Sequence, residues 1–220
     1  MSIRIIDAET DPRIEHFEHF LAMPDPFVTL TVQMDITEWY GRLRGKGYPF
    51  FLSFQYEVAA AANSVPEFRR RIRNGRVIEY DVCGASYTAA LPDGTYRYCD
   101  VRTDLPFEEY LKEAKVVQEQ ALKQEHLVES EDPESRFFIS CVPWLSYSSL
   151  EMPKPSSDFS VPSITWGRLY TEKALAEKDG VPTTEERVKI PVTVMVNHAL
   201  ADGIHISRFF SKLEERLGNR

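Results

Sequence analysis

Hydrophobic positions along the chain alternate between the period of a strand and that of an amphipathic helix. Strands are predicted over residues 3–6, 27–36, 137–144, 163–170 and 188–196, with shorter alternating segments between 76 and 101. Helices are predicted over residues 13–22, 37–43, 50–63, 66–73, 107–125 and 204–217. Because these elements follow one another in mixed order, the sequence predicts the α+β class, with a two-layer mixed β-sheet flanked by helices.

Local signals refine several of these elements. Asp11 and Pro12 are expected to cap and open the first helix, and Thr37 is expected to cap the second. The arginine-rich stretch 66–73 is expected to be a short basic helix with a solvated, charged face. The charged stretch 172–187 is expected to form the exposed tip of a long hairpin.

Composition and charge narrow the class of protein. The chain has 220 residues, 43% of them hydrophobic, and is expected to form a single domain over residues 1–220. Its formal charge of −8 argues against nucleic acid as the main partner, since phosphate binding needs a basic surface. No apolar run approaches the roughly 20 residues of a membrane helix, and the first residues lack a signal-peptide core, so we expect a soluble, cytoplasmic protein. Cys83, Cys99 and Cys141 lack CxxC spacing and are expected to be reduced, buried thiols, with no metal site.

The most suggestive polar residues lie where the last predicted strand meets the last predicted helix. His198 ends the strand and Asp202 follows four residues later. Histidine is the side chain that can act as a general base near neutral pH unaided, and the carboxylate could orient it or stabilise its charge. Alternatively, Asp202 only caps the helix and His198 is a satisfied polar residue. Arg13 lies in the first turn of a helix, where a cation is unfavourable, which indicates a partner elsewhere.

Six segments in chain order resemble the trimeric type of chloramphenicol acetyltransferase. They are residues 13–18, 31–37, 66–69, 138–144, 164–168 and 198–209. The resemblance covers roughly Arg13 to Leu217. It implies the fold of CoA-dependent acyltransferases and an O-acetyltransferase that acetylates a hydroxyl of chloramphenicol or a similar small acceptor. It also implies acetyl-CoA as co-substrate, no tightly bound cofactor, and a homotrimer with active sites between subunits.

The resemblance assigns roles to five residues. His198 would remove the proton from the acceptor hydroxyl, which then attacks the thioester directly, without an acyl-enzyme. Ser140 would donate a hydrogen bond to the oxyanion, and Thr165 would stabilise the intermediate through a water. Asp202 would pair with Arg13 and fix the loop that presents the imidazole.

The resemblance also indicates binding residues. Phe20 and Met152 match acceptor contacts, and Tyr96 or Tyr98 could replace a further aromatic contact. Arg168 matches a basic position beside bound CoA, suitable for a phosphate contact. Without the resemblance, the aromatic and aliphatic residues could equally be core residues and Arg168 a solvent-facing charge.

Departures from the family pattern around the expected acceptor pocket leave the acceptor open. The stretch 172–187 is longer than its family counterpart, and residues 27–30 and 85–98 drift from the family pattern. Asn197 stands where the family has a second histidine, which the mechanism does not need. One alternative is therefore an acyltransferase of the same fold acting on a different alcohol or thiol acceptor. The other is a catalytically inactive trimeric homologue that serves as a binding protein.

Overall fold

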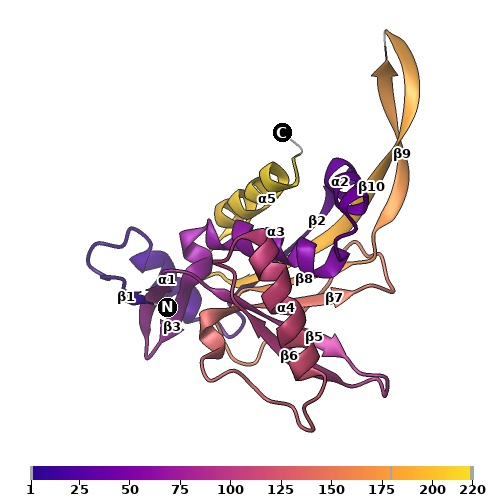
Figure 1. Ribbon diagram of the computed structural model, residues 1–220. Coiled ribbons are helices and arrows are strands. Elements are labelled where there is room, and N and C mark those ends of the chain that lie inside the picture. Colours follow the sequence, from indigo (N-terminus) through magenta and orange to yellow (C-terminus); the bar gives the residue numbers. More distant parts are fainter. Residues whose placement is uncertain (1, 179, 219–220) are drawn as a thin grey trace.

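A seven-stranded mixed sheet forms the centre of the computed structural model, which describes residues 2–178 and 180–218 (Figure 1). The strand order is β2-β10-β8-β7-β5-β6, and β9 pairs with the outer part of β10. The strands are β2 (Phe27–Asp35), β5 (Gly84–Ala90), β6 (Tyr96–Val101), β7 (Arg136–Val142), β8 (Ser163–Gly167), β9 (Tyr170–Lys178) and β10 (Val181–Asn197). The β5–β7 and β7–β8 pairs are parallel and the others antiparallel, which confirms the predicted mixed sheet.

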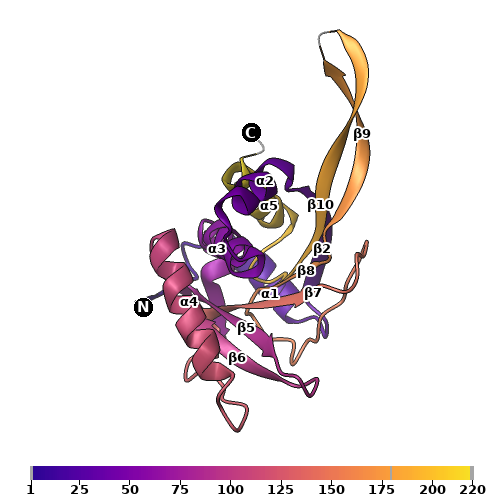
Figure 2. The same ribbon diagram turned by 45° about the vertical axis from the view of Figure 1, so that its right-hand side comes forward.

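Four helices cover one face of this sheet (Figures 1 and 2). They are α2 (Thr37–Lys46), α3 (Phe50–Asn63), α4 (Phe107–Ala121) and α5 (Gly203–Leu217). A fifth helix, α1 (Ile14–Leu21), belongs to a separate small cluster, in which Phe17 packs with Leu200 after the end of β10. This separation places α1 beside the junction between β10 and α5.

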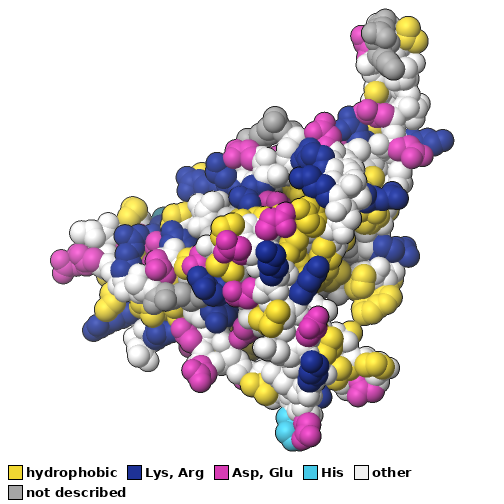
Figure 3. All heavy atoms as spheres, in the orientation of Figure 1, with side chains coloured by type: hydrophobic (Ala, Val, Ile, Leu, Met, Phe, Trp, Pro, Cys, Tyr) yellow, Lys and Arg dark blue, Asp and Glu magenta, His cyan; other side chains and the backbone are white. Residues whose placement is uncertain are grey.

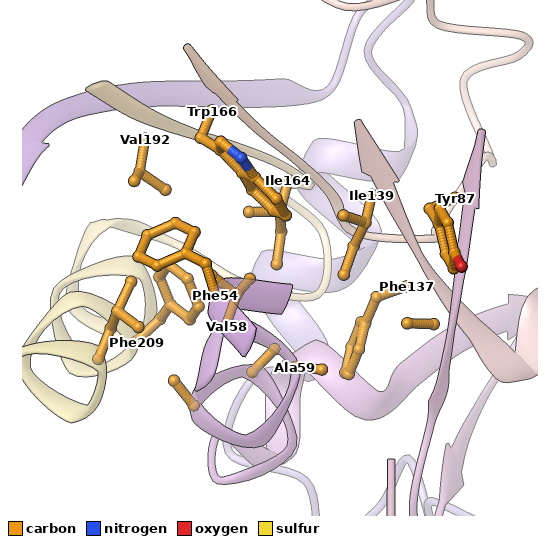
Figure 4. Close-up of a cluster of buried hydrophobic side chains, with 14 of the residues drawn as sticks. Phe54, Val58, Ala59, Tyr87, Phe137, Ile139, Ile164, Trp166, Val192 and Phe209 are labelled. Atoms are coloured by element: carbon orange, nitrogen blue, oxygen red, sulfur yellow. The ribbon is translucent and has the colours of Figure 1, made fainter. Parts of the chain in front are cut away.

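The core forms where α3 and α5 pack against alternate residues of the strands. In Figure 4, Phe54 and Val58 of α3 and Phe209 of α5 face Trp166 and Ile164 of β8. The Phe54 and Trp166 ring centroids are 5.1 Å apart in an edge-to-face arrangement, a favourable geometry for aromatic pairs. Because strand side chains alternate, the neighbours of these core residues point to the opposite face of the sheet.

A second, three-stranded sheet corrects one sequence prediction. Only Pro66–Arg69 is helical, as the short 3-10 helix η1, and Arg70–Arg73 is strand β3, which pairs with β4 (Arg76–Tyr80) and through it with β1 (Ile3–Ile5). The predicted basic helix is therefore wrong beyond its first turn. The reason is Asn74-Gly75, whose φ angles of 52° and 70° make the two-residue turn that joins antiparallel strands.

The solvated face expected for the arginine run is also wrong. Arg71 is fully buried, and its guanidinium donates hydrogen bonds to four backbone carbonyl groups. These belong to Phe68 (2.8 Å), Arg70 (2.6 Å), Glu134 (2.7 Å) and Arg136 (2.9 Å). A buried charge is tolerated only when its polar groups are satisfied, and here the carbonyls satisfy them. Arg71 thereby ties β3 to the start of β7 through η2 (Pro133–Ser135).

The long charged hairpin is present, but its sides are strands instead of a loop. β9 pairs with β10 from Tyr170↔Lys189 to Lys178↔Val181. This part extends away from the body of the molecule (Figures 1 and 2), and Leu175 on it is 92% exposed. On the face seen in Figure 3, basic and acidic side chains are interspersed along the arm and body without forming one large area of a single sign.

Smaller differences concern helix ends. The first helix begins at Ile14 instead of Arg13, because Asp11 accepts the backbone N–H of Arg13 (3.0 Å) in a turn before it. At the start of α2, the Asp35 side chain accepts the backbone N–H of Thr37, so Asp35 and not Thr37 caps this helix. The helix continues to Lys46, three residues beyond its predicted end. α4 ends at Ala121, four residues before the predicted end. In the described part of the chain, no helix is long and apolar enough to cross a membrane.

Replacing the buried arginine should destabilise the fold. In Arg71→Ala, four carbonyl groups lose their donor inside the protein, and an unsatisfied buried polar group costs about 1–3 kcal/mol. We expect the free energy of unfolding, from urea denaturation at fixed protein concentration, to fall by about 3 kcal/mol or more. The exposed Arg76→Ala is the matched control, with a change of about 0.5 kcal/mol or less. Equal losses in the two variants would contradict the assignment.

Candidate active site

The junction between β10 and α5 is a short, buried turn that presents a histidine. The backbone N–H of His198 donates to the carbonyl of Pro26 (2.6 Å), and the N–H groups of Leu200 and Ala201 donate to the carbonyl of Asn197 (both 3.0 Å). The intervening Ala199, Leu200 and Ala201 are all buried. The turn is therefore fixed both to the chain before β2 and to the end of β10.

Helix α1 fixes the imidazole of His198. The Phe20 ring stacks on it, with the ring centroids 3.8 Å apart and the planes 8° from parallel. The Nδ1 atom is buried and has no hydrogen-bond partner among the described residues. The ring is thus held by aromatic packing and by its backbone.

The predicted ion pair between Arg13 and Asp202 is present. An Arg13 amino group lies 2.6 Å from Oδ2 of Asp202, and the other is 3.4 Å from the carbonyl oxygen of His198. Burial raises the pKa of Asp202, but the hydrogen bond and charge of Arg13 outweigh it, so the pKa is lowered overall. Arg13, which lies at the N-cap of α1 and makes an unfavourable contribution there, thus has a charged partner and contacts the histidine loop itself.

Two predicted hydroxyl residues lie side by side on neighbouring strands. Ser140 on β7 pairs with Thr165 on β8, and Thr165 pairs with Thr193 on β10, five residues before His198. Paired residues share a face of the sheet, and this face is opposite to the one that carries Trp166. The sheet register therefore brings Ser140 and Thr165 to the same face near the end of β10.

A tyrosine and two further threonines, to which sequence analysis assigned no role, extend this row of hydroxyl groups. The Tyr147 hydroxyl donates to the carbonyl of Thr165 (3.0 Å) and lies 3.4 Å from the Thr193 hydroxyl, which in turn is 2.7 Å from that of Thr31. Gly167 permits this packing, because a Cβ there would lie 2.8 Å from the Tyr147 ring. Burial raises the pKa of Tyr147, so its hydroxyl stays a donor at neutral pH.

Asn197, which sequence analysis noted only as a departure from the family pattern, has a structural role. Its amide nitrogen donates to the carbonyl groups of Ser157 (2.9 Å) and Phe159 (3.0 Å), and its amide oxygen accepts the N–H of Ala199 (3.0 Å). The side chain is buried, with 3% of its surface exposed. Asn197 therefore connects the loop before β8 to the turn that carries His198.

Of the remaining predicted site residues, some lie close to His198 or Thr165 and others lie farther away. Phe20 contacts His198, and the sulfur of Met152 lies 3.3 Å from the Thr165 hydroxyl. Arg168 is exposed directly after β8. Tyr96 is on β6, the edge strand beyond β7 and β5, and its ring packs on Tyr98, so one chain does not bring it to His198.

The fold is shared with the catalytic cores of acyltransferases. A solved structure of the Azotobacter vinelandii dihydrolipoamide acetyltransferase is similar with a TM-score of 0.66 at 18% identity, over 93% of this chain and 86% of that chain. At this level of identity, the similarity establishes a common fold. The chain thus has the fold of a CoA-dependent acyltransferase core.

The family is narrower than the fold. The model of the chloramphenicol acetyltransferase family matches residues 1–214, and the chain belongs to this family of acyltransferases. The Escherichia coli chloramphenicol acetyltransferase is 26% identical over 215 residues, covering 96% of this chain and 91% of its own. A solved chloramphenicol acetyltransferase has a TM-score of 0.84 at 25% identity, over 98% of this chain and all of that one.

Removing the two donors of Asn197 should loosen the junction. In Asn197→Asp, a carboxylate replaces the amide and faces two carbonyl oxygens, while its interaction with the Ala199 N–H is kept. We expect the free energy of unfolding to fall by about 1–3 kcal/mol. Gln120→Glu adds the same charge at an exposed position of α4 and should change it by about 0.5 kcal/mol or less. An Asn197→Asp variant as stable as this control would show that the loop does not depend on the amide.

Proposed function

We propose that this protein is an acetyl-CoA-dependent O-acetyltransferase and that His198 is its general base. The observation that carries the proposal is the family match over residues 1–214 together with a histidine whose ring is held in place by the stacked Phe20 ring. A base must be fixed at hydrogen-bonding distance from the proton it removes, and stacking on Phe20 supplies such fixation.

The proposed reaction is a direct transfer. His198 removes the proton of the acceptor hydroxyl, and the oxygen attacks the thioester carbonyl carbon to form a tetrahedral intermediate. When the intermediate collapses, the carbon–sulfur bond breaks and the CoA thiolate takes the proton back from His198. No acyl-enzyme is needed, because both substrates are bound together and proximity supplies much of the rate enhancement.

Two strand hydroxyls are proposed to stabilise the intermediate. Ser140 would donate to the oxyanion, and Thr165 would act through a water molecule. Their support is the register of β7, β8 and β10, which places both on one face near the end of β10. Asp202 and Arg13 are proposed to hold the histidine loop and to take no part in proton transfer, since both are engaged with each other at 2.6 Å.

The acceptor is proposed to be chloramphenicol or a similar small alcohol. Phe20 and Met152 would contact it, and their positions against His198 and Thr165 support this role. Arg168, exposed at the end of β8, would contact a phosphate of CoA. Tyr96 is distant within one chain, so its proposed acceptor contact would require a second subunit.

Loss of the base should abolish most turnover. We expect CoA thiol release from acetyl-CoA with chloramphenicol, or with another alcohol from a panel, to fall about 10²–10⁴-fold in kcat in His198→Ala. Ser140→Ala should lower kcat about 10²–10³-fold. The control is His126→Ala, at an exposed position after α4. Turnover that survives His198→Ala unchanged would remove His198 as the base, whereas turnover of another alcohol but not chloramphenicol would reassign only the acceptor.

The active form is proposed to be a homotrimer with sites between subunits. We expect sedimentation equilibrium at micromolar concentration to give three times the subunit mass of 25.4 kDa. Activity on dilution should fall together with the trimer fraction. A fully active species of monomer mass would contradict both the assembly and the proposed contribution of Tyr96 from a second subunit.

A further inference from the structure

A second histidine lies beside the candidate base and is more deeply buried. His205 is the third residue of α5, one turn after Asp202, and only 5% of its surface is exposed. Its Nδ1 accepts the backbone N–H of Asp202 (3.1 Å) and lies 2.8 Å from Oδ1 of the same residue. Its Nε2 faces Oε1 of Glu67, on η1, at 3.5 Å. His205 therefore joins the start of α5 to a different part of the fold.

The contact with the Asp202 N–H requires one protonation state of His205. To accept this N–H, Nδ1 must carry no proton, so the neutral ring would have its proton on Nε2, on the side of Glu67. Burial lowers the pKa of His205, and Arg13 on α1 and Arg208 on α5 act in the same direction. The carboxylates of Glu67 and Asp202 oppose this shift without cancelling it.

Asp202 and His205 form a capping box at the start of α5, with a histidine at the third helical position. In a capping box, Glu or Gln at the third helical position accepts the backbone N–H of the N-cap residue. Here the N-cap residue is Asp202, and His205 takes the place of Glu or Gln. The two ends of Asp202 are thus held by different elements, the carboxylate by Arg13 from α1 and the backbone by His205.

We propose that His205 is a positioning residue, which holds Asp202 from the backbone side and through it the loop that presents His198. Glu67 lies on the Nε2 side of the ring, where the neutral tautomer that makes this possible carries its proton. Protonation of Nδ1 would direct a proton at Oδ1 of Asp202 and remove the acceptor of the Asp202 N–H, so the cap would be exchanged for an ion pair. The catalytic part of this inference rests on the proposed function, and the structural part does not.

Two substitutions separate positioning from mere packing. His205→Gln keeps an acceptor for the N-cap N–H and cannot titrate, whereas His205→Leu fills the space without an acceptor. We expect His205→Leu to lower kcat about 10- to 100-fold with KM unchanged, as small displacements of a catalytic group do, and His205→Gln to restore most of the loss. Wild-type kcat in His205→Leu, or no rescue by Gln, would overturn the proposal.

Nuclear magnetic resonance of the histidine rings gives a readout that does not need activity. In the ¹⁵N-labelled protein at neutral pH, we expect His205 to be the neutral tautomer protonated at Nε2. The ring-proton shifts of His198, displaced by the stacked Phe20, should move in His205→Leu and return in His205→Gln. Protonation at Nδ1, or His198 shifts that do not respond, would overturn the proposal even if no substrate were turned over. If His205→Leu does not fold, Glu67→Gln is used in its place. Because the Glu67 charge raises the pKa of His205, its removal should lower that pKa further. An unchanged pKa of His205 in Glu67→Gln would overturn the proposal.

The pH dependence of stability provides an independent check with a defined sign. Because the native pKa of His205 lies below its unfolded value of about 6.5, its neutral form stabilises the fold fully above that pH. This stabilisation is lost as the pH falls from about 6.5 through the native pKa. We expect the difference in Tm between wild type and His205→Gln to shift in favour of the variant over that range, whereas a constant difference would overturn the assigned neutral state. Failure of every acceptor to react would disprove the proposed function while leaving this measurement and the resonance shifts to decide on His205.

Discussion

The ion pair between Arg13 and Asp202 is the interaction on which the rest of the candidate site depends. It joins two elements that are 189 residues apart in the chain, at a distance of 2.6 Å. The same arginine reaches the carbonyl of His198, and the helix that it begins carries Phe20, which stacks on the imidazole. Both side chains are largely shielded from water, so separating them would leave a charge poorly solvated. The ion pair therefore connects the loop that carries His198 to the start of the helix that carries Phe20.

The sequence predicted those features whose cause is local. The helix over 50–63 has the predicted bounds because an apolar, alanine-rich segment has both the propensity and the buried face of a helix. The unfavourable charge of Arg13 at a helix start correctly indicated a distant partner. The prediction of a solvated basic helix at the arginine run was wrong because charge was taken to mean exposure. Arg71 is instead buried, and carbonyl groups from segments far along the chain accept its hydrogen bonds.

The residues missed at the site have a common reason. Asn197 and Tyr147 make hydrogen bonds to segments that no local pattern brings together, and His205 faces Glu67 from a distant part of the chain. The amide of Asn197, for example, binds a loop 38 to 40 residues earlier in the chain. Resemblance to a family indicated that Asn197 differs from the expected histidine, but only the fold reveals what the amide contacts. Polar residues that connect distant loops are thus the least predictable part of a site.

The two faces of the central sheet divide stability and chemistry between adjacent residues. Trp166 points into the core against Phe54, while its neighbour Thr165 lies on the other face beside Ser140. The two-residue period of a strand enforces this division, so the hydroxyl groups are held as firmly as the core is packed. A catalytic group must be held within a fraction of an ångström to be effective. Packing on the apolar face therefore fixes the positions of the hydroxyl groups, and a change in the core beneath β8 reaches Thr165, one of the two hydroxyl residues proposed to stabilise the intermediate, through a single peptide unit.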